Sequence, residues 1–92
     1  MVTAIVLMTI ARGKVQPVAS ALLELPAVNE VYSVAGPFDL VAVIRVTRHD
    51  ELNDLVTQRL AAIDGISATQ TLVAFRCYSK KDVKAMWDIG LD

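Results

Sequence analysis

Two stretches of the sequence are apolar at both odd and even positions, and this double pattern limits the folds open to the chain more than any other feature. Residues 2–11 carry polar side chains only at Thr3 and Thr9, and residues 40–44 carry none. Successive side chains of a strand point to opposite faces of a sheet. A sheet built from these segments is therefore apolar on both faces, whereas a sheet with one face in water should alternate.

Such a sheet needs a cover on each face. Helices of the same chain can bury one face, and we expect a second copy of the chain to bury the other in a two-fold, sheet-to-sheet homodimer. Apolar area removed from water contributes about 25 cal/mol per Å². A few hundred Å² of the uncovered face would thus favour association by several kcal/mol before the cost of association.

The rest of the chain alternates between helical and strand patterns. Apolar residues at helical spacing, with Pro17 in the first turn and Pro26 after the end, predict a first helix. A stripe of apolar residues from Leu52 to Ile63 predicts a second helix, which Gly65 would end. In order, we expect strand 2–11, helix 15–25, strand 28–35, strand 39–47, a helix between residues 49 and 65, and strand 66–78.

This order predicts an α+β fold of the ferredoxin-like type, a βαββαβ sandwich. In it a four-stranded antiparallel sheet carries two helices on one face. Residues 1–78 would form this single domain, and residues 79–92 a helical tail. In the tail, Ser79 followed by Asp82 resembles a capping box. It would open a short helix whose apolar side chains, Trp87 among them, pack on this subunit or a neighbour.

Composition excludes several classes of partner. The chain has 92 residues, a formal net charge of −1 and one cysteine. Its apolar runs are far shorter than the roughly 20 residues of a membrane span. No block of basic residues is present that could bind a nucleic acid backbone directly. The start of the sequence lacks the features of a secretory signal, and Cys77 alone cannot form an internal disulfide. We therefore expect a cytoplasmic protein.

One candidate binding residue is Asp39, which stands between the predicted hairpin turn and an apolar strand. A carboxylate at such a place needs a partner, and the ammonium group of a ligand is one candidate. Aspartate also caps turns through its own backbone, and chemistry alone favours that structural role.

A second candidate is the pair Thr69 and Thr71. Residues two apart on a strand share a face, so the two hydroxyls point the same way. Beside free backbone N–H groups they could bind the carboxylate of a small zwitterion. Threonine is also a common strand residue, and each hydroxyl taken alone is better explained as structural.

Taken together, these residues resemble a known family. Gly36, Phe38, Asp39 and Leu40 in one turn, then Gly65-Ile66, then the Thr-x-Thr pair are similar to the regulation-of-amino-acid-metabolism (RAM) domain of the Lrp/AsnC transcription regulators. The resemblance covers nearly the whole chain, from Val2 to about Tyr78.

The resemblance implies an effector-binding module with no catalytic residues, cofactor or metal. It implies that dimers formed through the sheets assemble further, commonly to an octamer, and bind a small amino acid between dimers. The implied ligand-binding residues of this chain are Gly36, Phe38, Asp39, Leu40, Thr69 and Thr71. We expect Gly36 to let the ligand approach the backbone and Phe38 to line its side-chain pocket. Asp39 would meet the ammonium or fix the loop, and the threonines would meet the carboxylate.

The sequence departs from full-length family members in one respect. Those members carry an N-terminal helix-turn-helix, whereas the first strand here begins at Val2. We therefore expect a stand-alone RAM protein that regulates transcription or metabolism through co-assembly with a DNA-binding Lrp/AsnC relative or through effector buffering.

Small ferredoxin-like enzymes, such as cofactor-independent monooxygenases and isomerases, are one alternative. They need a convergent set of acidic, basic or hydrogen-bonding groups in a cleft. The sole imidazole, His49, falls in a strand-to-helix connection, where a capping or solvated role fits it better. One histidine and one cysteine do not make a metal ligand set.

The ACT domain is an alternative from the class of binding modules. It shares the element order and uses a glycine turn after its first strand, about where Gly13 stands. The combination of Phe38-Asp39 with the two threonines favours the RAM domain instead.

Overall fold

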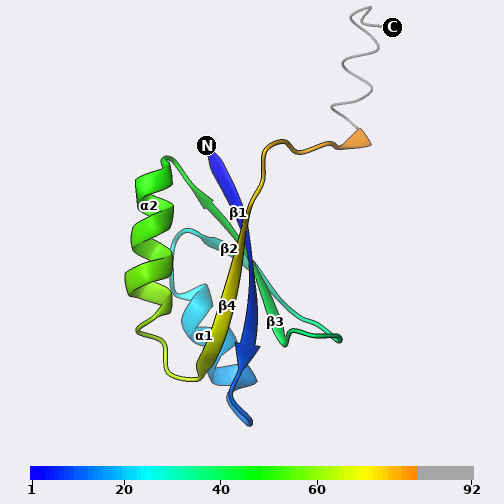
Figure 1. The fold of residues 1–92 in the computed structure, drawn as a ribbon, viewed down its shortest axis with the longest axis vertical. Helices are drawn as coiled ribbons and strands as arrows, with labels where there is room; N and C mark the ends of the chain where they lie inside the picture. Colours follow the sequence, from blue (N-terminus) through cyan, green and yellow to red (C-terminus); the bar gives the residue numbers. More distant parts are fainter. Residues whose placement is uncertain (81–92) are drawn as a thin grey trace, which may run out of the picture.

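The strands form one antiparallel sheet whose central pair consists of the two doubly apolar segments. In the computed structural model, which describes residues 1–80, the sheet order is β2-β3-β1-β4. Both helical segments lie on the same side of it (Figure 1). This is the expected ferredoxin-like arrangement. Its elements are β1 (Val2–Ile10), α1 (Val15–Leu23), β2 (Val28–Ser33), β3 (Leu40–Val46), α2 (His49–Asp54), η1 (Leu55–Leu60) and β4 (Ile66–Val73).

The register of the central strands separates their side chains into a covered and an uncovered set. Val6 pairs with Ala42, and both are fully buried under the helices. Ile5 pairs with Val43 on the opposite face, where both are only half-buried. We call this second face, which neither α1 nor the α2–η1 helix covers, the open face.

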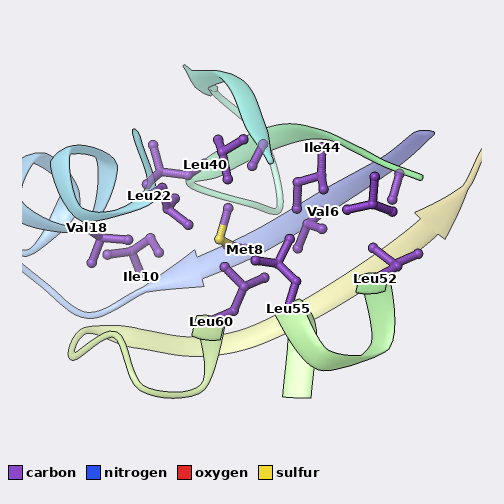
Figure 2. Close-up of a cluster of buried hydrophobic side chains, with 14 residues drawn as sticks. Val6, Met8, Ile10, Val18, Leu22, Leu40, Ile44, Leu52, Leu55 and Leu60 are labelled. Carbon is purple, nitrogen blue, oxygen red and sulfur yellow. The ribbon is translucent and has the colours of Figure 1, made fainter. Parts of the chain in front are cut away.

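The hydrophobic core lies between the covered face of the sheet and the helices (Figure 2). Met8 at its centre is 0% exposed. Burial of these apolar side chains is the main force that holds the helices on the sheet. The core residues are Ala4, Val6, Met8, Ile10, Val18, Leu22, Val28, Leu40, Ala42, Ile44, Val46, Leu52, Leu55 and Leu60.

The first helix ends two residues earlier than the apolar spacing predicts. The N–H groups of Glu24 and Leu25 bond to the carbonyls three residues before them, at 3.2 Å and 3.0 Å. Such short-range bonds tighten and end a helix. Pro26 follows, and the chain turns into β2.

The second helix is not one uniform α-helix. It begins as α2 and continues as the π-helical segment η1, in which hydrogen bonds span five residues instead of four. The apolar stripe from Leu52 through Leu55 to Leu60 is nevertheless buried as expected.

The fourth strand ends at Val73, so the expected strand 66–78 was too long. Just after its end, the N–H of Ala74 donates a hydrogen bond to the carbonyl of Thr3 at 2.9 Å. This bond lies next to the start of β1 at Val2, so little of β1 is left for β4 to pair with. The two hairpin strands are also shorter at the turn than expected, since β2 ends at Ser33 and β3 starts at Leu40. The expected C-terminal helix with Trp87 lies outside the described residues.

Candidate functional site

The hairpin loop, residues 34–39, lies at one end of the sheet between β2 and β3. It is closed by a bond from the N–H of Val34 to the carbonyl of Asp39 at 3.1 Å. Gly36 has a φ of +131°, which disfavours any residue with a side chain. A Cβ added to Gly36 would meet no atom within 4 Å. The backbone at this glycine is therefore open to an approaching molecule.

Asp39 ties this loop to the central strand. Its N–H donates to the carbonyl of Met8 at 2.9 Å. Its carboxylate Oδ2 accepts from the N–H of Ile10 at 2.7 Å. The carboxylate thus has a structural role, but not the expected capping of its own turn, because it binds a backbone donor at the end of β1.

The two neighbours of Asp39 differ in what they can offer a ligand. Phe38 is half-buried, so part of its ring faces solvent. Leu40 is 1% exposed and belongs to the core. Its side chain packs inside the domain rather than towards the loop.

Thr69 and Thr71 lie on β4 and share a face, as expected. They pair with Met8 and Val6, so both hydroxyls lie on the helix-covered side. Thr69 also borders a hollow of about 290 Å³ against η1, which Val56 and Leu60 line. Within the described residues β4 has a neighbour only on its β1 side. Its outer backbone groups are therefore an open sheet edge.

One strand separates the threonines from the hairpin loop. Met8 of β1 pairs with Leu40 on one side and Thr69 on the other. Neighbouring strands lie about 4.8 Å apart, so the two groups are roughly 10 Å apart. Thr69 lies towards the hairpin end of the sheet and Thr71 at its middle, and the core residue Met8 lies between Thr69 and the hairpin strand. A single chain does not bring the Asp39 carboxylate against the two hydroxyls.

The open face is an apolar surface with a charged rim. Leu72 is 45% exposed on it. A hollow of about 580 Å³ is lined by Ile5 and Val43 together with the charged residues Glu30 and Arg45. After β4 the chain runs away from the sheet (Figure 1, orange).

Within residues 1–80 the other titratable groups do not converge on a catalytic arrangement. His49 is the first residue of α2 and is exposed. Tyr32 donates to the Glu30 carboxylate at 2.7 Å, and this hydrogen bond, with the negative charge of Glu30, raises the pKa of Tyr32. Among residues 1–80 no three His, Cys, Asp or Glu side chains are grouped to hold a metal ion. The described part of the chain contains no helix with the length and apolarity needed to cross a membrane.

A further hollow, of about 280 Å³, lies at the end of the sheet opposite the hairpin loop. The spacing of apolar residues did not predict it. Asp54 and Arg59 line it. The two residues are five apart, which is not a shared face of an α-helix. Sequence patterns that assume α-helical spacing therefore place them on different faces.

Comparison with known proteins gives a consistent result. The family described as the Lrp/AsnC ligand binding domain matches residues 3–83. The chain is 30% identical over 79 residues to the HTH-type transcriptional regulator FL11 of Pyrococcus furiosus, and the match covers 86% of this chain and 52% of that protein. The chain thus spans about half the length of this relative.

Two solved structures illustrate the range of the similarity. TTHA0845 from Thermus thermophilus superposes with a TM-score of 0.81 at 48% identity, covering 87% of this chain and 100% of that one. The transcriptional regulator NMB0573 from Neisseria meningitidis, solved as a complex with L-Met, has a TM-score of 0.78 at 15% identity, covering 85% of this chain and 52% of that one. At this identity the second comparison shows the shared fold alone. The matching family model is that of a ligand-binding domain, and the curated relative is an HTH-type transcriptional regulator.

Proposed function

Since the chain belongs to the Lrp/AsnC ligand binding domain family, we propose that it senses a small amino acid in the cytoplasm and regulates transcription or metabolism through its state of assembly. The observation that carries this proposal is the separation of the site residues. Asp39 lies at the hairpin end of the sheet, Thr69 pairs with Met8 near that end and Thr71 pairs with Val6 at the middle of β1, so that β1 stands between the loop and the threonines.

Assembly would occur in two steps. In the first, two chains bury their open faces against each other, which removes the apolar surface around Ile5, Val43 and Leu72 from water. In the second, dimers join into a ring, commonly of eight chains, through the end of the sheet that carries the hairpin loop. The ligand would bind at this second contact, where a neighbouring subunit completes the site.

The geometry supports the following roles for the proposed site residues. Gly36 leaves its backbone free, and the partly exposed ring of Phe38 offers an apolar surface. Asp39 holds the loop through Ile10, so its free oxygen would be the one that meets an ammonium group. Thr69 and Thr71 would donate to the ligand carboxylate. Leu40 supports the loop from the core.

An amino-acid effector fits the polar groups at this end of the domain. The regulator NMB0573, which shares the fold, was solved with L-Met. Regulation would follow if the effector binds one assembly more tightly than another, because a ligand shifts an equilibrium only through such a difference. Co-assembly with a DNA-binding relative of the FL11 kind would carry the signal to a promoter.

The test combines light scattering with a thermal-shift screen of the twenty amino acids. We expect a dimer or larger species, and at least one amino acid that raises the unfolding midpoint. Thr71→Val, which keeps the shape of the side chain, should remove this shift. Ser20→Ala, on the exposed side of α1, should leave it unchanged. A monomer at micromolar concentration, or an equal shift in the Thr71 variant, would contradict the proposal.

A further inference from the structure

The hollow that Asp54 and Arg59 line lies at the end of the sheet opposite the hairpin loop. Its volume is about 280 Å³, at the small end of ligand pockets, which are roughly 300–1,000 Å³. The connection between α1 and β2, shown in cyan in Figure 1, forms one wall, and the α2–η1 helix forms the other. Val46, the last residue of β3, lies at its floor. Leu40 at the other end of β3 is about 20 Å away at the usual rise per residue.

The lining combines an apolar floor with charges of both signs. Leu25, Val46 and Leu55 supply the apolar part, and Glu51, Asp54 and Arg59 supply the charges. The Glu51 carboxylate is already engaged, since it accepts from the N–H of Thr47 at 3.3 Å and lies 3.7 Å from the Arg48 guanidinium.

Asp54 and Arg59 are not neutralised by the rest of the described chain. The ion pairs within residues 1–80 are Lys14–Asp64, Arg48–Asp50 and Arg48–Glu51. Neither Asp54 nor Arg59 takes part in one, and the Asp54 side chain does not cap the helix that follows it. An aspartate and an arginine therefore line the same hollow without an ion pair between them.

The π-helical segment explains how these two residues come to share the hollow. In an α-helix, residues three and four apart share a face, and residues five apart do not. Asp54 and Arg59 are five apart and flank the first turn of η1, where hydrogen bonds span five residues. A wider turn reduces the angle about the helix axis between residues five apart, and both residues line the hollow. π-Helical turns are rare and occur frequently at functional sites.

We propose that this hollow is a second binding site, for an amino-acid zwitterion with an apolar side chain. The ammonium group meets the Asp54 carboxylate, with Glu51 adding negative charge nearby. The carboxylate of the ligand meets the Arg59 guanidinium, whose planar fork can bind both oxygens. The apolar side chain lies against Leu25 and Leu55. This site needs residues of one chain only, whereas the hairpin site proposed above needs a neighbour.

The experiment is a titration of the ¹⁵N-labelled protein followed by amide NMR. The probes are L-leucine and two analogues, leucinamide without the carboxylate and 4-methylpentanoate without the ammonium. We expect L-leucine to shift the amides of Ala27, Val46, Asp54 and Arg59 in a saturable way. Each analogue should bind at least tenfold more weakly, because one charged group of the site loses its partner.

Variants separate this site from the hairpin site. Asp54→Asn and Arg59→Gln change exposed side chains, so both variants should fold, which circular dichroism checks. Each should weaken L-leucine binding at the hollow at least tenfold. Gln58→Ala, an exposed position on the same segment that does not line the hollow, should bind like the parent, as should Thr71→Val.

Three results would overturn the proposal. The first is the absence of saturable shifts around the hollow at millimolar L-leucine, and the second is equal binding by both charge variants. The third is shifts confined to residues 36–40 and 69–71, which would support the hairpin site and exclude this one. Shifts around the hollow with none at the hairpin would support this site while contradicting the amino-acid role of the hairpin residues.

Discussion

The carboxylate of Asp39 accepts a hydrogen bond of 2.7 Å from the backbone N–H of Ile10. The bond joins the hairpin loop to the last residue of β1, twenty-nine residues earlier in the chain. Asp39, which the sequence predicts to contact a ligand, therefore also holds the hairpin loop to β1. Any change at Asp39 acts on the stability of the loop as well as on binding.

Replacing Asp39 by Ala should lower the free energy of unfolding by about 2 kcal/mol, because hydrogen bonds to charged groups contribute roughly 1.5–3 kcal/mol. Urea denaturation measures the change. Asp64→Ala is the control, since its ion pair with Lys14 at 3.6 Å is exposed and should contribute less than about 1 kcal/mol. Equal effects of the two substitutions would contradict the structural role of Asp39.

Gly65→Ala should destabilise the domain more than Gly13→Ala. Both glycines have positive φ, +105° and +79°, and a side chain there costs about 1–2 kcal/mol. At Gly65 an added Cβ would also come within 2.9 Å of Lys14 Cβ and Val18 Cγ2, whereas at Gly13 it meets nothing within 4 Å. Thermal unfolding of the two variants should rank them in that order, and the reverse order would contradict the close packing of Gly65 on α1.

Two adjacent leucines of α1 offer a matched test of the core. Leu22 is 0% exposed and Leu23 is 56% exposed. We expect Leu22→Ala to cost about 2–5 kcal/mol through lost burial and the cavity left behind, and Leu23→Ala less than about 1 kcal/mol. Comparable losses in chemical denaturation would mean that α1 does not pack on the sheet through Leu22.

Much of this fold is predictable because its strongest signals are local. The doubly apolar segments become the central strands β1 and β3, as two-sided burial requires, and the order of elements then limits the topology. The position of Leu22 in the core follows from helical spacing alone. The shared face of Thr69 and Thr71 likewise follows from the two-residue repeat of a strand.

Other features depend on contacts that a single stretch of sequence does not contain. The end of β4 at Val73 is set by where β1 begins, and the distance between Thr69 and the hairpin loop is set by the strand order. The π-helical segment η1 leaves no mark in the apolar pattern, from which we predict an ordinary helix. The hollow that Asp54 and Arg59 line also involves the connection between α1 and β2, and a hollow between two segments is not visible in the spacing of one helix.

The open face should determine the proposed dimer. Leu7 pairs with Val41 and Gln70 near the middle of that face, so Leu7→Glu would place a charge where a partner sheet is expected. Burial of an unpaired carboxylate is strongly unfavourable. Light scattering should then report a monomer, whereas Gln16→Glu on the exposed surface of α1 should keep the parent mass. A Leu7→Glu variant with the parent mass would indicate a different interface.

Tyr32 should ionise only above the ordinary pKa of a phenol, because its hydrogen bond to Glu30 and the charge of that carboxylate favour the protonated form. The stabilising effect of this pair is complete below the ordinary pKa and disappears as the pH rises through the raised value of the folded chain. Ultraviolet titration in a Tyr78→Phe background, which leaves one tyrosine, would measure it. Glu30→Gln should lower the Tyr32 midpoint, and an unchanged midpoint would contradict the assigned cause.

The position of β1 between β3 and β4 has a consequence for synthesis of the chain. Ile5 pairs with Val43 and with Leu72, so the first strand of the domain receives its last neighbour only when the domain is nearly complete. Closing so long a loop is slow compared with local folding. Until β4 emerges, the nascent sheet has an unpaired central strand with apolar side chains beside it, and fast completion or a chaperone is needed to protect it.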